Sequence, residues 1–209
     1  MKRLLFVVVL FVAMLCTTIE ARAQFDLGKA FGALLEQQST SKPKDPLAAI
    51  AEAAPSSREV VRTWGYERIF FEYLGANPLA DMAMQQLDVT VQAALKREGI
   101  VPGSFSLTLR RNGTGFIIFK EYAIDGRYDY IEEKGRATFI INIEGVDYQC
   151  GGFMKMRGDN LVVMLDAGDI FDIIVAAYPE YRNDSTALTM QGLLESFKGI
   201  FISLEFHKM

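Results

Sequence analysis

Few residues in this chain belong to the types that bind metals or attack substrates. His207 is the single histidine and stands near the C-terminus. Zinc and iron sites draw on several nitrogen or sulfur ligands, and the sequence offers neither a second histidine nor a cysteine cluster. We therefore predict no metal site and no cofactor, and we expect His207 to lie exposed in a frayed chain end.

The two cysteines, Cys16 and Cys150, lie far apart in the sequence. Cys16 falls in an N-terminal apolar run that we expect to be cleaved off, so the processed chain keeps one cysteine and forms no intramolecular disulfide. No histidine stands near Cys150 to activate its thiol, which favours a buried structural thiol over a nucleophile. The sequence has no Gly-x-Ser-x-Gly elbow, P-loop or dinucleotide fingerprint, so we predict no catalytic residues and no enzymatic activity.

Four carboxylates gather around one predicted turn, namely Asp125, Asp129, Glu132 and Glu133. Paired carboxylates can hydrolyse glycosidic bonds, and carboxylate oxygens also bind Ca²⁺. Charges at the end of a hairpin are more often simply solvated. A hydrolase that uses Asp129 and Glu132 is therefore the less favoured alternative.

Five aromatic residues are the candidate ligand-binding residues: Trp64, Tyr66, Tyr128, Tyr130 and Tyr148. A tyrosine that faces the inside of a barrel lines a pocket with an apolar ring and a polar tip. Alternatively, the same side chains pack the core or decorate the barrel rim. They predict a pocket only if the elements that carry them close into a barrel.

Short alternating segments between Ser104 and Asp166 are the elements that must position these side chains. Apolar and polar residues alternate there at period two, and turn signals such as Asn112-Gly113 separate the segments. This pattern is typical of an antiparallel meander. Gly151-Gly152 stands inside one segment and predicts a bulge or a sharp bend.

The whole pattern predicts a mainly β fold, an antiparallel up-and-down meander or barrel of about eight strands. One helix runs from Asn77-Pro78 to Gly99 between the first two strands, and two helices over 169–178 and 185–198 precede the last strand. Such a barrel is filled by its own side chains or holds one small ligand. We expect strands over 60–73, 104–110, 116–119, 124–131, 137–144, 146–157, 161–165 and 200–206.

The first 23 residues have the pattern of a secretory signal peptide. Lys2 and Arg3 precede an apolar run over 4–15, and Ala21-Arg22-Ala23 forms a small-x-small cleavage site. The run is too short for a stable membrane span, so we expect no transmembrane span in the mature chain. We predict an exported protein that resides in the periplasm or the cell envelope or is secreted.

Residues 24–58 form an N-terminal segment ahead of the main domain over 59–209. We expect residues 25–37 to form a weak amphipathic helix that docks on the domain, the alternative being an anchor to a membrane or a partner. Residues 38–44 have the composition of a flexible tether, and residues 45–54 include a helical segment.

Charge excludes one class of partner. Loss of the leader removes Lys2, Arg3, Arg22 and Glu20 and changes the formal net charge from −4 to −6. A mildly acidic surface repels phosphate backbones, and no stripe of basic residues interleaved with aromatic residues is present. We therefore predict that nucleic acid is not a partner.

Several short motifs follow one another in a fixed order over 60–209. They are Thr63-Trp64-x-Tyr66, a helix ending near Gly99-Ile100, Asn112-Gly113-Thr114-x-Phe116, Gly126-x-Tyr128, Leu165-Asp166-Ala167 and a closing strand that begins at Gly199. In this order they resemble the DUF4923 family, exported Bacteroidetes proteins of unknown function with lipocalin-like folds. Arg62 stands where lipocalin-like openings usually place a glycine. The resemblance implies a lipocalin-like barrel in the cell envelope and carries no catalytic residues.

Together these observations favour an exported lipocalin-like protein without catalysis, which binds a small apolar or amphipathic molecule or serves a cell-envelope protein. The rivals are a structural or interaction module with a filled barrel, and the hydrolase named above. An eight-stranded outer-membrane barrel fits less well, because it needs an unbroken outward apolar band. The predicted helices are capped, and segment 104–110 has a polar face.

Overall fold

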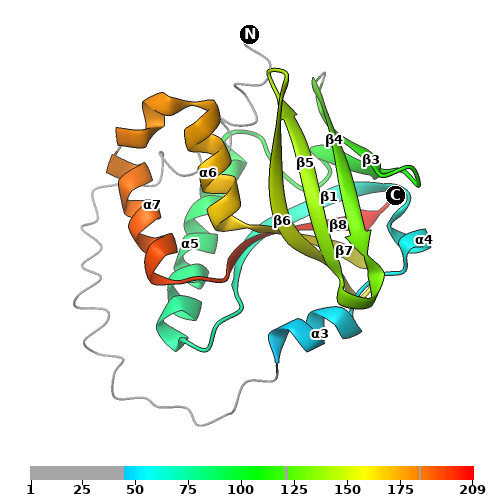
Figure 1. Cartoon of the computed structure of the whole chain (residues 1–209), viewed down its shortest axis with the longest axis horizontal. Coiled ribbons are helices and arrows are strands. Elements are labelled where there is room, and N and C mark those ends of the chain that lie inside the picture. Colours follow the sequence, from blue (N-terminus) through cyan, green and yellow to red (C-terminus); the bar gives the residue numbers. More distant parts are fainter. Residues whose placement is uncertain (1–44, 121, 184) are drawn as a thin grey trace.

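A closed barrel of eight antiparallel strands forms the body of the protein, and each strand pairs with its neighbours in sequence (Figure 1). The computed structural model describes residues 45–209 except 121 and 184, so the predictions for residues 1–44 lie outside the described residues. The predicted fold class is confirmed. The strands are β1 (Thr63–Tyr73), β2 (Phe105–Leu109), β3 (Thr114–Phe119), β4 (Tyr122–Ile131), β5 (Arg136–Ile143), β6 (Val146–Arg157), β7 (Asn160–Asp166) and β8 (Ile200–Lys208).

Helices lie where the sequence predicted them within 45–54, 77–99, 169–178 and 185–198, whereas the short helical elements over 57–60, 132–134 and 179–183 were not predicted. Figure 1 shows α5, α6 and α7 together on one flank of the barrel, with α3 set apart from them. The helix over the N-terminal part of segment 45–54 is α3, and its N-cap Asp45 accepts a hydrogen bond from Leu47 N at 3.0 Å. The helical elements are α3 (Pro46–Glu52), α4 (Ser57–Val60), α5 (Pro78–Arg97), η1 (Glu132–Lys134), α6 (Ala167–Ala177), η2 (Pro179–Asn183) and α7 (Ser185–Ser196).

The up-and-down order places successive connections at alternating ends of the barrel. One end, here the helix end, carries the connection with α5, the β3–β4 and β5–β6 turns, and α6 with α7. The other end, here the closed end, carries the three remaining turns, α4 and the C-terminal residues of β8.

The segment before β1 docks across the closed end. The Tyr130 hydroxyl donates to Pro55 O at 2.7 Å, and Met156 N donates to Ala53 O at 2.7 Å. The Glu132 carboxylate accepts from Ser57 N at 2.7 Å. Because these contacts tie α3 and α4 to β4, β6 and η1, this part of the chain packs on the barrel.

Apolar side chains fill the interior near the closed end. Trp64, Cys150, Met154, Leu161 and Phe206 are each at most 1% exposed. Cys150 is therefore the buried thiol that the sequence predicted, and burial raises its pKa to about 12. A neutral thiol in this place acts as a small apolar side chain.

Gly152 marks a close approach between β6 and β7. The register of β6 with β5 and with β7 runs without a shift through this residue, so the structure has no bulge here. A Cβ atom at Gly152 would overlap the carbonyl oxygen of Met164 on β7. The two strands thus approach more closely than any side chain would allow.

Replacing Gly152 by alanine is therefore expected to destabilise the fold by about 3 kcal/mol, because backbone on both sides must move. Urea unfolding of the two proteins measures the difference. Gly192→Ala in α7 is the matched control, since a Cβ atom there has no neighbour within 4 Å and alanine favours a helix. Equal stability of the wild type and Gly152→Ala would contradict this account of the close approach between β6 and β7.

Candidate functional site: an apolar cavity in the barrel

Towards the helix end, the barrel contains a cavity of about 240 Å³ that is partly open to solvent. Seven of the eight strands contribute to its wall, and α5 and α6 cover it with Leu95, Ile170, Ile173 and Ile174. Almost all of the wall is apolar. The cavity is the site that the closed sheet and its two covering helices create together.

Several side chains around the cavity are less buried than those near the closed end. Phe139, Ile141, Leu165 and Leu204 face the interior, yet each keeps partial solvent exposure. Met154 on β6 and Leu161 on β7, nearer the closed end, are each 0% exposed. The barrel is therefore filled towards the closed end and hollow towards the helix end.

Aromatic rings form one wall of the cavity. Tyr66 of β1 stacks on Phe105 of β2 with ring centroids 4.2 Å apart. Phe206 of β8 meets both rings edge-on, at 6.3 Å from Tyr66 and 6.0 Å from Phe105. Such contacts fix the orientation of the three rings, so this wall combines one stacked pair with one perpendicular ring.

Two of the five candidate ligand-binding residues, Tyr66 and Tyr128, line this cavity. Burial raises the pKa of Tyr66 to about 12. The Tyr128 hydroxyl donates to Arg110 O at 2.8 Å, and burial raises its pKa as well. The two side chains therefore present mainly their rings to the cavity, and the hydroxyl of Tyr128 bonds the protein's own backbone.

The other three candidates lie elsewhere. Trp64 is 1% exposed, donates from Nε1 to Val60 O at 3.0 Å, and lies under the Arg62 guanidinium, whose central carbon is 5.2 Å from the ring centroid. Arg62 thus covers the indole at the closed end. Tyr130 bonds the segment before α4, and burial and the nearby Glu132 raise its pKa. Tyr148 is partly buried against the core and does not line the cavity.

Several of the cavity residues that the candidate set missed are aliphatic side chains of the covering helices. Ile170, Ile173 and Ile174 of α6 share one face at helical spacing, and this spacing was the available signal. Gly115 and Gly126 were a second signal. They pair directly across β3 and β4 and expose backbone to the cavity in place of side chains.

The acidic residues do not converge. Asp125 and Asp129 are exposed on the outer face of β4, and Glu132 binds the backbone of Ser57. Seven residues of extended strand separate Asp125 from Glu132, which is about 20 Å. Among residues 45–209, with the gaps at 121 and 184, no group of three or more His, Cys, Asp or Glu side chains could hold a metal ion.

His207 does not lie in a frayed end, so that prediction is wrong. β8 extends to Lys208 because it pairs with β1, and His207 stands opposite Gly65. Its Nδ1 atom is 3.2 Å from a carboxylate oxygen of Glu67, the residue at the register shift in β1. The imidazole is 41% exposed and packs over the glycine.

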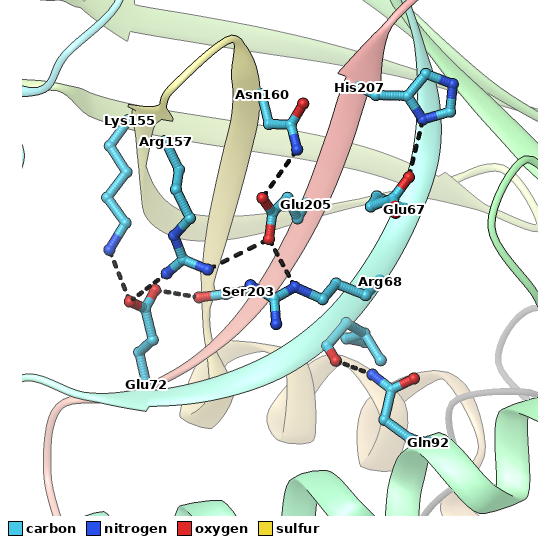
Figure 2. Close-up of polar contacts among 11 residues, drawn as sticks. Glu67, Arg68, Glu72, Gln92, Lys155, Arg157, Asn160, Ser203, Glu205 and His207 are labelled. Atoms are coloured by element: carbon cyan, nitrogen blue, oxygen red, sulfur yellow. Dashed lines mark hydrogen bonds and ion pairs between the residues drawn. The ribbon is translucent and has the colours of Figure 1, made fainter.

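A polar network covers the outer wall over β1, β6, β7 and β8 (Figure 2). Glu205 is 4% exposed and accepts from Arg68 at 2.7 Å, Asn160 at 3.0 Å and Arg157 at 3.2 Å. Glu72 pairs with Lys155 at 2.7 Å. These side chains lie above buried residues of the outer wall, so the network closes a second, smaller apolar cluster made of Ile50, Phe70, Val162, Met164 and Phe201.

Glu205 should make the fold sensitive to acid. Burial alone would raise its pKa, but hydrogen bonds from Asn160 and Arg68 and the charges of Arg68 and Arg157 hold the pKa below its ordinary value. A carboxyl group with a lowered pKa stabilises the fold above its unfolded pKa, which is about 4.3, and this contribution is lost as the pH falls through the folded pKa.

We therefore expect Glu205→Gln to unfold more easily at pH 7, by about 1–3 kcal/mol, because arginine donors lose their charged acceptor. Below pH 4 the difference from the wild type should shrink. Urea unfolding between pH 3 and pH 7 measures both effects, with the exposed Glu133→Gln as control. A difference that stays constant across this range would contradict the assignment.

None of the helices in the described part of the chain is long and apolar enough to cross a membrane.

The closed eight-stranded barrel with a cavity towards one end is a lipocalin-like fold. The chain belongs to the DUF4923 family, because the family model "Lipocalin-like domain (DUF4923)" matches residues 34–208. This range also includes α3 and α4. The predicted family is thus confirmed.

One solved structure is similar to this chain, a DUF4847 family protein from Bacteroides vulgatus ATCC 8482. The two share 13% sequence identity over 71% of this chain and 94% of the other, with a TM-score of 0.36. No curated protein matches the chain.

Proposed function

We propose that this protein is an exported, non-catalytic binding protein that holds one small, uncharged, apolar molecule inside the barrel. The observation that carries the proposal is the cavity of about 240 Å³ towards the helix end, with its almost wholly apolar wall and with the Tyr128 hydroxyl bonded to Arg110 O. A ligand with a charged or strongly polar group inside this space would lose its hydration without compensation.

The volume limits the ligand to about one or two rings or a short chain. An engineered protein cavity of about 150 Å³ holds benzene, and pockets for drug-sized ligands measure about 300–1,000 Å³. The aromatic wall of Tyr66, Phe105 and Phe206 favours an aromatic ring, which can stack or make edge-on contacts, over a branched aliphatic molecule. For a ligand of this size we expect a Kd on the order of 10 µM.

The sequence supports export. Residues 1–23 have the charged start, apolar run and cleavage site of a signal peptide, so we place the protein in the periplasm or envelope or outside the cell. An envelope protein as a partner remains the alternative to a small ligand.

Naphthalene is a suitable probe, because it fills two rings and carries no polar group. Its fluorescence during titration with the full-length processed protein should report saturable binding to one site. Decanoic acid and decylamine place a charged group against an almost wholly apolar wall, so they should bind more weakly than naphthalene.

Ile141→Phe places a larger side chain in the cavity wall and should weaken naphthalene binding at least tenfold. The fold should keep its melting temperature, because the added ring enters free space. Tyr128→Phe is the matched control and should bind as the wild type does, since the hydroxyl bonds Arg110 O. Absence of binding in the wild type, or equal binding by Ile141→Phe, would overturn the proposal.

A further inference from the structure

The ladder between β1 and β2 is the shortest in the barrel. It has three residue pairs, from Thr63 opposite Thr108 to Gly65 opposite Ser106, whereas β1 and β8 share nine. β2 begins at Phe105, so β1 from Tyr66 to Tyr73 has no strand on that side. An uncovered edge of this length would leave backbone groups without partners.

Helix α5 lies along this edge and replaces the missing strand with two side chains. Asp88 accepts a hydrogen bond from Phe71 N at 2.6 Å. Gln92 donates to the carbonyl oxygen of Ile69, a contact drawn in Figure 2. Four residues of helix rise about 6 Å and two residues of strand about 6.7 Å, so the two contacts stay in step.

The same helix separates the cavity from solvent. Leu95 is 2% exposed and lines the cavity, together with Ile100 just beyond the helix. On the opposite face, Met82 is 47% exposed and Val89 is 67% exposed. One layer of helix therefore stands between the cavity and the solvent beside β1.

The wall made by α6 is held more firmly. α6 continues directly from β7, and its Asp169 accepts from Gly151 N of β6 at 2.6 Å. Between β4 and β5 the ladder begins at Gly126 and Ile141, and the exposed Arg127–Asp147 ion pair joins β4 to β6 across β5. Backbone ladders, unlike side-chain contacts, break only with the sheet itself.

We propose that α5 is the movable wall through which the ligand enters and leaves, with Asp88 and Gln92 as its latch on β1. This inference rests on the proposed function, because it concerns access to the same cavity. Movement of α5 by a few ångströms along its length opens the β1–β2 gap without breaking any strand pair. Ligand exchange is then limited by release of the latch.

Stopped-flow fluorescence with naphthalene and the full-length processed protein tests the latch. The double variant Asp88→Ala/Gln92→Ala should bind and release naphthalene about tenfold faster than the wild type, with Kd unchanged within twofold. Asp88→Asn is the matched control. It keeps an acceptor for Phe71 N and should retain the wild-type rates.

Asp147→Asn tests the rival route between β4 and β5, and it should leave both rates unchanged. If the double variant does not fold, Gln92→Ala alone should still speed both rates, and unchanged rates there would overturn the inference. Faster exchange in Asp147→Asn would also overturn it. Binding with wild-type rates in every variant refutes the latch alone, whereas no binding by the wild type refutes the proposed function.

Discussion

Closure between the first and last strands is the interaction on which the rest of the structure depends. Nine residue pairs join β1 to β8, although 126 residues separate the end of β1 from the start of β8. Without this ladder the sheet would have two free edges and no inside. With it, inward side chains share one enclosed volume, and outward side chains need a separate cover. The cavity and the polar network on the outer wall are the two consequences.

Side chains fill the interior of the barrel unevenly along its axis. Large buried side chains, among them Trp64 and Phe206, fill the barrel towards the closed end, where α3 and α4 also dock. Paired glycines on β3 and β4 leave space in the wall of the cavity, and towards the helix end α5 and α6 cover it. The filled closed end thus stabilises the fold, and the helix end contains the cavity. We therefore expect that a residue near the helix end can change without loss of the fold.

Periodicity predicted the fold, and it did so because alternation reports which face of each strand is buried. The eight strands, the helix after the first strand and the two helices before the last strand follow from alternation, caps and turn glycines. Tyr66 and Tyr128 could be placed in the cavity because they alternate with polar neighbours. Trp64 and Tyr130 have the same pattern, and the sequence does not show at which height of the barrel a residue stands.

Residues that act across distant elements could not be predicted. In the sequence, Asp88 and Gln92 have the pattern of the polar side of an amphipathic helix. They bond the edge of β1 because β2 is too short to cover it. His207 was predicted to lie in a frayed chain end, because its partner strand lies more than 130 residues earlier in the sequence. Contacts of this kind depend on strand register, which a single sequence does not contain.

The central claim is that the barrel has an apolar cavity towards the helix end. A crystal structure determined under xenon pressure tests it most directly, because xenon binds in dry apolar cavities and does not bind in filled cores. The account predicts xenon density inside the barrel between Ile141, Leu204 and the isoleucines of α6. A barrel whose interior side chains close this space, with no xenon bound there, would contradict it.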